Sequence, residues 1–130
     1  MIKKLHPKQA WEMLESNADA ILIDVRTAVE YAFVGHPPQS VFIPWKEAPD
    51  WTANPDFIKK VDEAVADKNT PLQLMCRSGQ RSLQAAHALE AGGYTDLTNI
   101  EEGFEGDLDD EKHRSTINGW RFHNLPWEQS

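Results

Sequence analysis

Apolar and polar residues alternate along the chain in a pattern that predicts strands separated by helices. Short, nearly continuous apolar runs are typical of strands buried on both faces of a parallel sheet, and longer stretches between them have apolar residues at helical spacing. The expected strands are 20–25, 40–43, 71–75 and 96–100. The expected helices are 7–16, 27–33, 55–67 and 82–91. This order predicts an α/β fold with a largely parallel central sheet flanked by helices on both faces.

Residues that cap or end helices support these boundaries. Thr27 and Glu30 have the spacing at which two side chains satisfy the free amides of a starting helix, so we interpret Glu30 as a cap. Asn54 is expected to cap the next helix, with Pro55 in its first turn. The pair Gly92-Gly93 is expected to end the last helix.

The chain has 130 residues, 40% of them hydrophobic, which is enough for one stable core, so we expect a single domain over 1–130. Cys76 is the only cysteine. This excludes an intrachain disulfide, and it excludes a zinc or iron–sulfur site built from several cysteines. The composition therefore favours a protein of a reducing compartment, which we interpret as the cytoplasm.

The charge balance limits the classes of partner. The formal net charge is −8, from 21 acidic and 13 basic residues, which argues against nucleic acid because phosphate binding relies on Lys and Arg. The first residues lack the apolar run of a signal peptide, and no stretch approaches the ~20 apolar residues that span a bilayer. We therefore expect a soluble protein that binds neither nucleic acid nor membrane.

Acidic residues are concentrated in one segment. Seven of the eleven residues from 101 to 111 are Asp or Glu, and no hydrophobic period continues through them. We expect a solvated loop over about 101–117, with a metal or partner site as the alternative. The tail 118–130 contains Trp120 and Trp127, which are too apolar to be left free, so we expect loop and tail to pack on the domain.

The segment 76–82, Cys-Arg-Ser-Gly-Gln-Arg-Ser, follows a predicted strand and precedes a predicted helix. In open α/β sheets, ligands bind beyond the carboxyl ends of the strands, where free amides and the positive end of a helix dipole face an anion. This position, with Arg77 and Arg81 close by, favours the thiolate form of Cys76. Gly79 allows the loop to turn its amides inward. The segment therefore predicts a sulfur nucleophile in an anion-binding loop.

The alternative interpretation of Cys76 is an inert buried residue, which is the commonest role of a single cysteine after an apolar strand. Two arginines within five positions favour the functional interpretation, because arginine is poorly placed in a core loop without an anionic partner. A reactive thiol here would attack an electrophilic centre of an anionic substrate and carry a covalent intermediate.

The loop 76–82 resembles the active-site loop of the rhodanese homology domain, the sulfurtransferase family. The upstream stretch 22–44, LIDVRTAVEYAFVGHPPQSVFIP, is similar to the first signature of that family. The segments 103–109 and 118–127 are similar to those of its single-domain members, so the likeness extends from about residue 5 to the end of the chain. Three such segments in the family's order are a more specific signal than the loop alone.

The resemblance implies a two-step sulfur transfer that uses neither a metal nor an organic cofactor. The Cys76 thiolate would attack the outer sulfur of a small anionic donor, thiosulfate or a similar molecule, expel sulfite and form a persulfide. Cyanide, a small thiol or a protein acceptor would then take the sulfur. Backbone amides and guanidinium groups of the loop would bind the donor and hold the persulfide. The residues implied are Arg77, Ser78, Gly79, Gln80, Arg81 and Ser82.

Residues outside the loop have mainly structural interpretations. Asp24 and Arg26, at the end of a predicted strand, are expected to pair with each other or with loop backbone and so to support the site. His36 matches the histidine of the family signature and is expected to be a structural hydrogen-bonding residue. Trp45 and Trp51 are expected to be core or rim aromatics, with the mouth of the pocket as the alternative location.

Two other functions are compatible with the sequence. Rhodanese-like domains also occur as regulatory binding modules or as modules that relay persulfide to a partner. Inactive versions commonly lose the cysteine, whereas a relay module would keep Cys76. A cysteine-dependent phosphatase or arsenate reductase is less favoured. Such phosphatases need five residues between the cysteine and the arginine of the loop, and only four separate Cys76 from Arg81.

Overall fold

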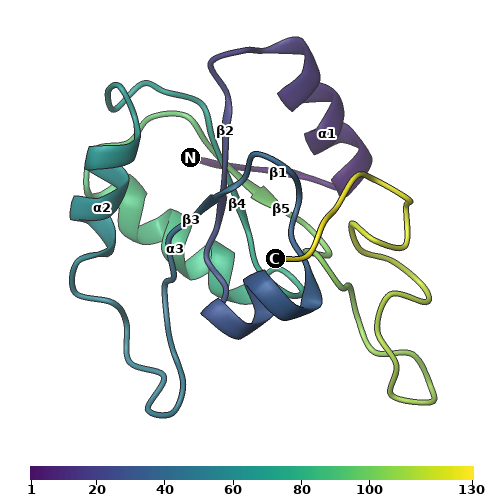
Figure 1. Cartoon of the computed structure of the whole chain (residues 1–130). Coiled ribbons are helices and arrows are strands. Elements are labelled where there is room, and N and C mark those ends of the chain that lie inside the picture. The colour runs from purple at the N-terminus through teal and green to yellow at the C-terminus, as the bar shows by residue number, and fades with distance from the viewer.

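The protein is described by a computed structural model of residues 1–130. Its five strands form one sheet in the order β1-β5-β4-β2-β3, and every neighbouring pair is parallel (Figure 1). This confirms the predicted α/β fold with a parallel central sheet. The elements in chain order are β1 (Ile2–Leu5), α1 (Pro7–Ser16), β2 (Ile21–Asp24), η1 (Glu30–Val34), β3 (Val41–Phe42), α2 (Phe57–Ala64), β4 (Leu72–Met75), α3 (Gln80–Ala91) and β5 (Leu97–Ile100).

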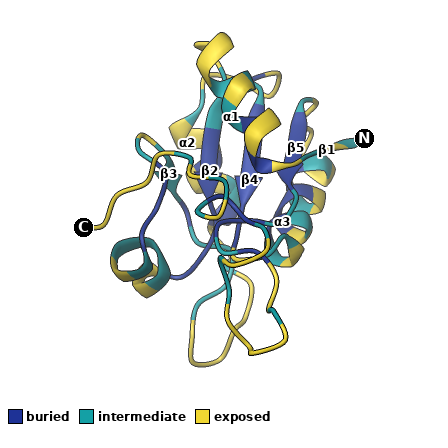
Figure 2. Ribbon diagram, turned by 90° about the vertical axis from the view of Figure 1, so that its right-hand side faces the viewer, coloured by how far each residue is buried: buried dark blue, intermediate teal, exposed yellow.

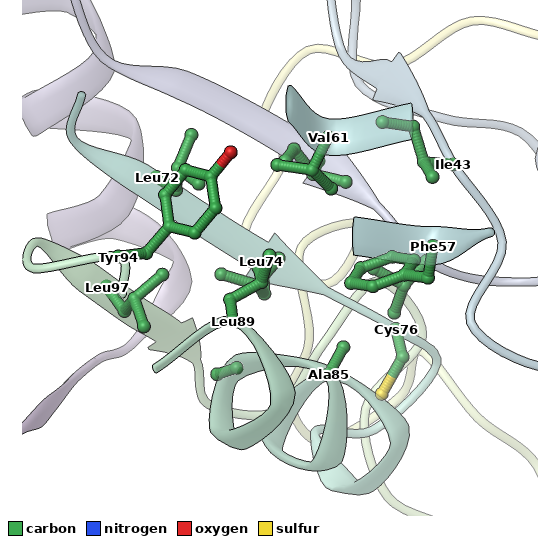
Figure 3. Packing of buried hydrophobic residues seen from close by; sticks show 13 residues of the cluster. Ile43, Phe57, Val61, Leu72, Leu74, Cys76, Ala85, Leu89, Tyr94 and Leu97 are labelled. Carbon is green, nitrogen blue, oxygen red and sulfur yellow. The ribbon is translucent and has the colours of Figure 1, made fainter. Parts of the chain in front are cut away.

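Helices cover both faces of the sheet, as predicted. α2 and α3 pack on one face, where Phe57 and Leu89 join a cluster of buried apolar side chains from the strands (Figure 3). α1 covers the other face, where Ala10 packs in a second cluster with Phe104 and Trp120 from the segment after β5. Figure 2 shows the central strands β2, β4 and β5 buried between these layers. Burial of each large apolar side chain stabilises the fold by about 1.5–3 kcal/mol.

β4 is the innermost strand, and all of Leu72–Met75 is buried. It has a paired strand on each side and helices over each face, which explains its nearly continuous apolar sequence. Gln73 is its one polar residue, and its side-chain amide nitrogen Nε2 donates a hydrogen bond to the Ala10 carbonyl at 3.1 Å. This bond ties α1 to the strand that carries Cys76 at its end.

β1 was not predicted from the sequence. Ile2 lies opposite Leu97 and Leu5 opposite Ile100, so β1 extends the sheet at the β5 edge. Its two outer residues are half-buried while Lys3 and Lys4 are exposed. An edge strand needs only a few apolar contacts, and lysines on it discourage pairing with other chains. The resulting sequence therefore lacks the apolar run by which the central strands can be recognised.

The helix predicted over 27–33 contains the short π-helix η1, which begins at Glu30. Two α-helices also begin at other residues than predicted. α2 begins at Phe57 instead of Pro55, because the Asn54 side chain shapes the turn before the helix: its Oδ1 accepts from the Asp56 N–H at 3.0 Å and its Nδ2 donates to the Pro44 carbonyl at 3.0 Å. α3 begins at Gln80, before the predicted Ser82, directly after Gly79.

The acidic segment after β5 forms no helix or strand, but its backbone is ordered by its own side chains. Asp109 accepts hydrogen bonds from the N–H groups of Glu111 and His113, at 2.8 and 2.9 Å, and from the Thr116 hydroxyl at 2.6 Å. In the tail, Trp120 is fully buried and donates from Nε1 to the Pro126 carbonyl at 2.8 Å. The segment is therefore a folded connection between β5 and the tail.

Candidate active site

Cys76 lies directly after β4 and is 1% exposed. Its Sγ accepts two hydrogen bonds, one from the Gly79 N–H at 3.1 Å and one from the Ser82 hydroxyl at 3.3 Å. Figure 3 shows Cys76 at the end of β4, with its sulfur directed toward α3. The loop therefore turns around the sulfur, and the amino-terminal end of α3, where the helix dipole is positive, faces it.

The conformation of Gly79 makes this turn possible. Its φ of +112° lies in the left-handed region, which residues with a side chain rarely adopt. No atom lies closer than 3.8 Å to a β-carbon built at this position, so the backbone conformation, not lack of space, requires glycine. The turn brings the Gly79 N–H onto the sulfur.

The predicted loop residues come together around one small cavity of about 140 Å³. Cys76 lies at its inner wall, half-buried Arg81 and Ser78 lie at its sides, and Arg77 and Gln80 are exposed at its rim. Gly79 and Ser82 do not line the cavity but donate to the sulfur from behind. The arrangement can hold a small anion against Cys76.

Arg81 has a carboxylate partner in addition to its place at the cavity. Its Nη1 and Nη2 donate to the Oε1 and Oε2 atoms of Glu30 at 2.8 and 2.9 Å. Oε1 of Glu30 also accepts from the N–H and hydroxyl of Thr27, at 3.1 and 3.0 Å, so Glu30 caps its helical turn as predicted. Glu30 is thus both a cap and the ion-pair partner of Arg81, and only the first role was predicted.

The charges of this pair reinforce each other. Burial raises the pKa of Glu30, but the hydrogen bonds and charge of Arg81, with those from Thr27, outweigh it and lower the pKa from 4.5 to about 2. Burial likewise lowers the pKa of Arg81, but the hydrogen bonds and charge of Glu30 outweigh this and raise it. Both groups are therefore ionised at neutral pH, and the guanidinium is held to one side of the cavity.

Asp24 and Arg26 form a second, fully buried ion pair. Nη2 of Arg26 lies 2.7 Å from Oδ2 of Asp24 and donates to the Gly35 carbonyl at 2.6 Å. The guanidinium carbon lies 4.5 Å from the centre of the Phe104 ring. The pair therefore connects the end of β2 to the end of η1 and to the segment after β5.

Asn99 in β5 is a site residue that the sequence reasoning missed. Its Oδ1 accepts from the Ser82 hydroxyl at 2.5 Å, and its Nδ2 donates to the Gly79 carbonyl at 3.1 Å. Asn99 therefore holds both residues that donate to the sulfur of Cys76. The Ser82 hydroxyl has one proton for two acceptors, Oδ1 of Asn99 and Sγ of Cys76. A polar residue in the middle of a buried strand was the signal that could have revealed it.

The segment after β5 supports the loop from behind. The Phe104 N–H donates to the Cys76 carbonyl at 2.8 Å, and the N–H groups of Glu105 and Gly106 donate to the Arg77 carbonyl at 3.0 and 3.2 Å. Gly103 has a φ of +65°, and a β-carbon there would lie 2.5 Å from the Cys76 carbonyl oxygen. The backbone of the loop is therefore in close contact with this glycine.

A larger groove of about 760 Å³ adjoins the small cavity, and Arg77 and Arg81 line both. Trp51 lines the groove and is 48% exposed. Trp45 lies elsewhere, edge-on to Phe57 with 5.2 Å between the ring centres. Of the two tryptophans considered for the mouth of the pocket, Trp51 is therefore the one that lies there.

The chain contains no group of three or more His, Cys, Asp or Glu side chains arranged to hold a metal ion. None of its helices is both long and apolar enough to cross a membrane. The groups around Cys76 are the Gly79 amide, the Ser82 hydroxyl and the guanidinium groups of Arg77 and Arg81.

Known proteins are similar to this chain in sequence and fold. The model of the rhodanese-like domain family matches residues 6–109. Rv0390 of M. tuberculosis, known from a crystal structure, is 39% identical with a TM-score of 0.88, and the match covers 98% of both chains. An uncharacterised protein of Rickettsia conorii is 33% identical over 98% of both chains. The thiosulfate sulfurtransferase GlpE of Haemophilus influenzae is 30% identical, over 80% of this chain and 86% of GlpE.

Proposed function

The chain belongs to the rhodanese-like domain family, and on this premise we propose that it is a sulfurtransferase working through a persulfide of Cys76. The donor is thiosulfate or a similar small anion with a sulfane sulfur, and the acceptor is cyanide or a thiol. The single observation that carries the proposal is the setting of the sulfur, which accepts from the Gly79 N–H at 3.1 Å and has the Ser82 hydroxyl, whose proton is shared with Asn99, at 3.3 Å. Donors directed at sulfur stabilise it as an anion.

In the first step the Cys76 thiolate attacks the outer sulfur of thiosulfate. A bond forms between Sγ and this sulfur, the sulfur–sulfur bond of thiosulfate breaks, and sulfite leaves with the electron pair. A cavity of about 140 Å³ limits the donor to a small molecule, and exposed Arg77 at its rim meets the departing oxyanion. Each hydrogen bond to the resulting persulfide anion stabilises it by about 1.5–3 kcal/mol.

In the second step the acceptor attacks the outer sulfur of the persulfide. Cyanide leaves as thiocyanate, or a thiolate leaves as a new persulfide, and the Cys76 thiolate is restored. The chain has no second cysteine to resolve the persulfide, so the sulfur atom leaves to another molecule. The sulfur is carried by Cys76 itself, and neither step takes an organic cofactor or a metal.

Arg81 acts in this proposal by shaping the cavity, because both of its terminal nitrogens are already bound to Glu30. The same contacts favour sulfur transfer over phosphate ester hydrolysis. In a phosphatase, the loop arginine must be free to bind the phosphoryl group through two hydrogen bonds. Asp24 and Arg26 support the site from the end of β2. We further propose that the protein works in the cytoplasm, where reducing conditions keep a single thiol free.

Steady-state kinetics with thiosulfate and cyanide test the proposal. We expect thiocyanate formation, with parallel lines in double-reciprocal plots because the two substrates react in separate steps. Cys76→Ser should form none, whereas His87→Gln, a change at an exposed residue of α3, should match the wild type. Absence of thiocyanate with the wild type, or equal formation by Cys76→Ser, would refute the proposal.

A further inference from the structure

We infer that the groove beside Cys76 binds the sulfur acceptor, and that this acceptor is a small organic thiol with a carboxylate group, held by Arg77 and Arg114. The inference rests on the proposed function and names the substrate class of its second step. It draws on three features of the groove: its unpaired arginines, the fixed position of Arg114, and its size and apolar surface.

Two arginines of the chain form no ion pair, and both line this groove. The chain has five arginines. Three are paired with carboxylates: Arg26 with Asp24 at 2.7 Å, Arg81 with Glu30 at 2.8 Å, and Arg121 with Glu105 at 3.8 Å. Arg77 and Arg114 have no such partner, and they lie on the wall of one cavity. An acidic protein that leaves only these two guanidinium groups unpaired presents a local site for an anion.

A hydrogen bond holds the Arg114 side chain in position on the wall of the groove. Its Nη1 donates to the Gly106 carbonyl at 2.6 Å, and the N–H of Gly106 donates to the Arg77 carbonyl at 3.2 Å. The next residue, Ser115, donates its N–H to the Glu105 carbonyl at 2.7 Å. Gly106 therefore connects the two arginines, and the half-buried side chain of Arg114 is held beside the loop of Cys76.

The carboxylates of the groove are already engaged. Glu30 binds Arg81, and Oε1 of Glu105, a lining residue, lies 3.8 Å from Nη2 of Arg121, which does not line the groove. Oε2 of Glu47 accepts from the Ala28 N–H at 2.9 Å. The remaining donors of Arg77 and Arg114 are thus available to a ligand, and a guanidinium matches a carboxylate in geometry as well as in charge.

The size and surface of the groove indicate an organic ligand. A small inorganic donor needs only the cavity of about 140 Å³, whereas the adjoining groove has about 760 Å³, within the usual range for small-molecule sites. Its wall includes Trp51 and Val29, which are 48% and 70% exposed and offer apolar surface to the body of such a molecule. Arg77 and Arg81 line both spaces, so a ligand in the groove lies next to the opening to Cys76.

The reaction at this site is balanced without a further reagent. The acceptor thiolate attacks the outer sulfur of the Cys76 persulfide, a new sulfur–sulfur bond forms, and the bond to Sγ breaks. The acceptor leaves as a persulfide anion, and Cys76 takes the electron pair as a thiolate. The carboxylate bound by Arg77 and Arg114 takes no part in bond changes and orients the thiol.

Transfer from thiosulfate to three thiols tests the inference: glutathione with two carboxylates, neutral 2-mercaptoethanol, and cationic cysteamine. With rates expressed per thiolate, we expect kcat/KM to fall in that order. Arg114→Gln should lower the ratio of kcat/KM for glutathione to that for 2-mercaptoethanol about tenfold. Lys112→Gln, which removes the same charge from an exposed neighbour, should leave the ratio unchanged. An unchanged ratio in Arg114→Gln, or an equal fall in Lys112→Gln, would overturn the inference.

Two further measurements separate this inference from the proposed function. Thiocyanate formation by the wild type from thiosulfate and cyanide reports the proposed function alone. If the wild type forms thiocyanate but shows the same kcat/KM for the three thiols, only the inference is overturned. Calorimetry with S-methylglutathione reports the site without any reaction, and its affinity should fall about tenfold in Arg114→Gln. If that variant does not fold, Arg77→Gln replaces it, because the Arg77 side chain is exposed and makes no hydrogen bond or ion pair. Equal affinity in wild type and variant would contradict a carboxylate site.

Discussion

Arg81 and Glu30 are 51 residues apart in the sequence, yet two hydrogen bonds of 2.8 and 2.9 Å join them at the site. Arg81 lies in the first turn of α3, and Glu30 begins η1. The pair therefore fixes α3 against η1 on one side of the cavity. It also gives the loop arginine a partner within the protein, so the shape of the site and the stability of the fold depend on the same contact.

This pair should make the stability of the protein sensitive to acid. The pKa of Glu30 is lowered from 4.5 to about 2, so its stabilising effect is complete above pH 4.5 and is lost as the pH falls toward 2. Allowing for its partial exposure, we expect Glu30 to contribute about 2 kcal/mol. Urea unfolding of the wild type and Glu30→Gln at several pH values measures this. The difference in unfolding free energy should shrink below pH 4.5, and a constant difference would contradict the prediction.

Arg81→Ala should impair folding and sulfur transfer together, because it leaves the carboxylate of Glu30 half-buried without its partner. A double-mutant cycle with Glu30→Gln should give a coupling free energy of about 1–3 kcal/mol in urea unfolding. The KM for thiosulfate is measured on the same four proteins. A large rise in this KM with unchanged stability would instead assign Arg81 to donor binding, the role implied by the family resemblance.

The pair also illustrates which parts of the structure the sequence can predict. The strands around 20–25 and 71–75 and the helix 7–16 follow from local periodicity, and the loop after β4 follows from its place between a strand and a helix. The partner of Arg81 depends on the fold bringing distant segments together, which no local pattern encodes. The same holds for Asn99, which acts on the loop from β5.

Gly103→Ala should damage the site through its backbone. The new β-carbon would lie 2.5 Å from the Cys76 carbonyl oxygen, so the loop must shift. Gly93→Ala is the matched control: its φ of +98° also lies in the range that residues with a side chain rarely adopt, but a β-carbon there has nothing nearer than 3.9 Å. We expect Gly93→Ala to lose about 1–2 kcal/mol of stability and keep its turnover, and Gly103→Ala to lose more stability and at least tenfold in kcat/KM. Equal turnover in the two folded variants would argue against this role of Gly103.

Asn99→Ala should reduce turnover because Ser82 and Gly79 lose the residue that holds them on the sulfur. Loss of these buried hydrogen bonds should cost about 1–3 kcal/mol of stability. Thr98→Ala is the control, since Thr98 is equally buried in β5 but its side chain makes no hydrogen bond to the loop. Per folded molecule, we expect the rate of Cys76 alkylation by iodoacetamide and kcat to change only in Asn99→Ala. The prediction fails if both variants retain wild-type values.

The central claim is that Cys76 carries sulfur as a persulfide, and intact-protein mass spectrometry tests it most directly. After incubation with thiosulfate and removal of the excess, the wild type should gain the mass of one sulfur atom. Cyanide should remove this sulfur as thiocyanate, and Cys76→Ser should gain none. A wild-type mass that does not change, or a sulfur adduct that persists in Cys76→Ser, would contradict the claim.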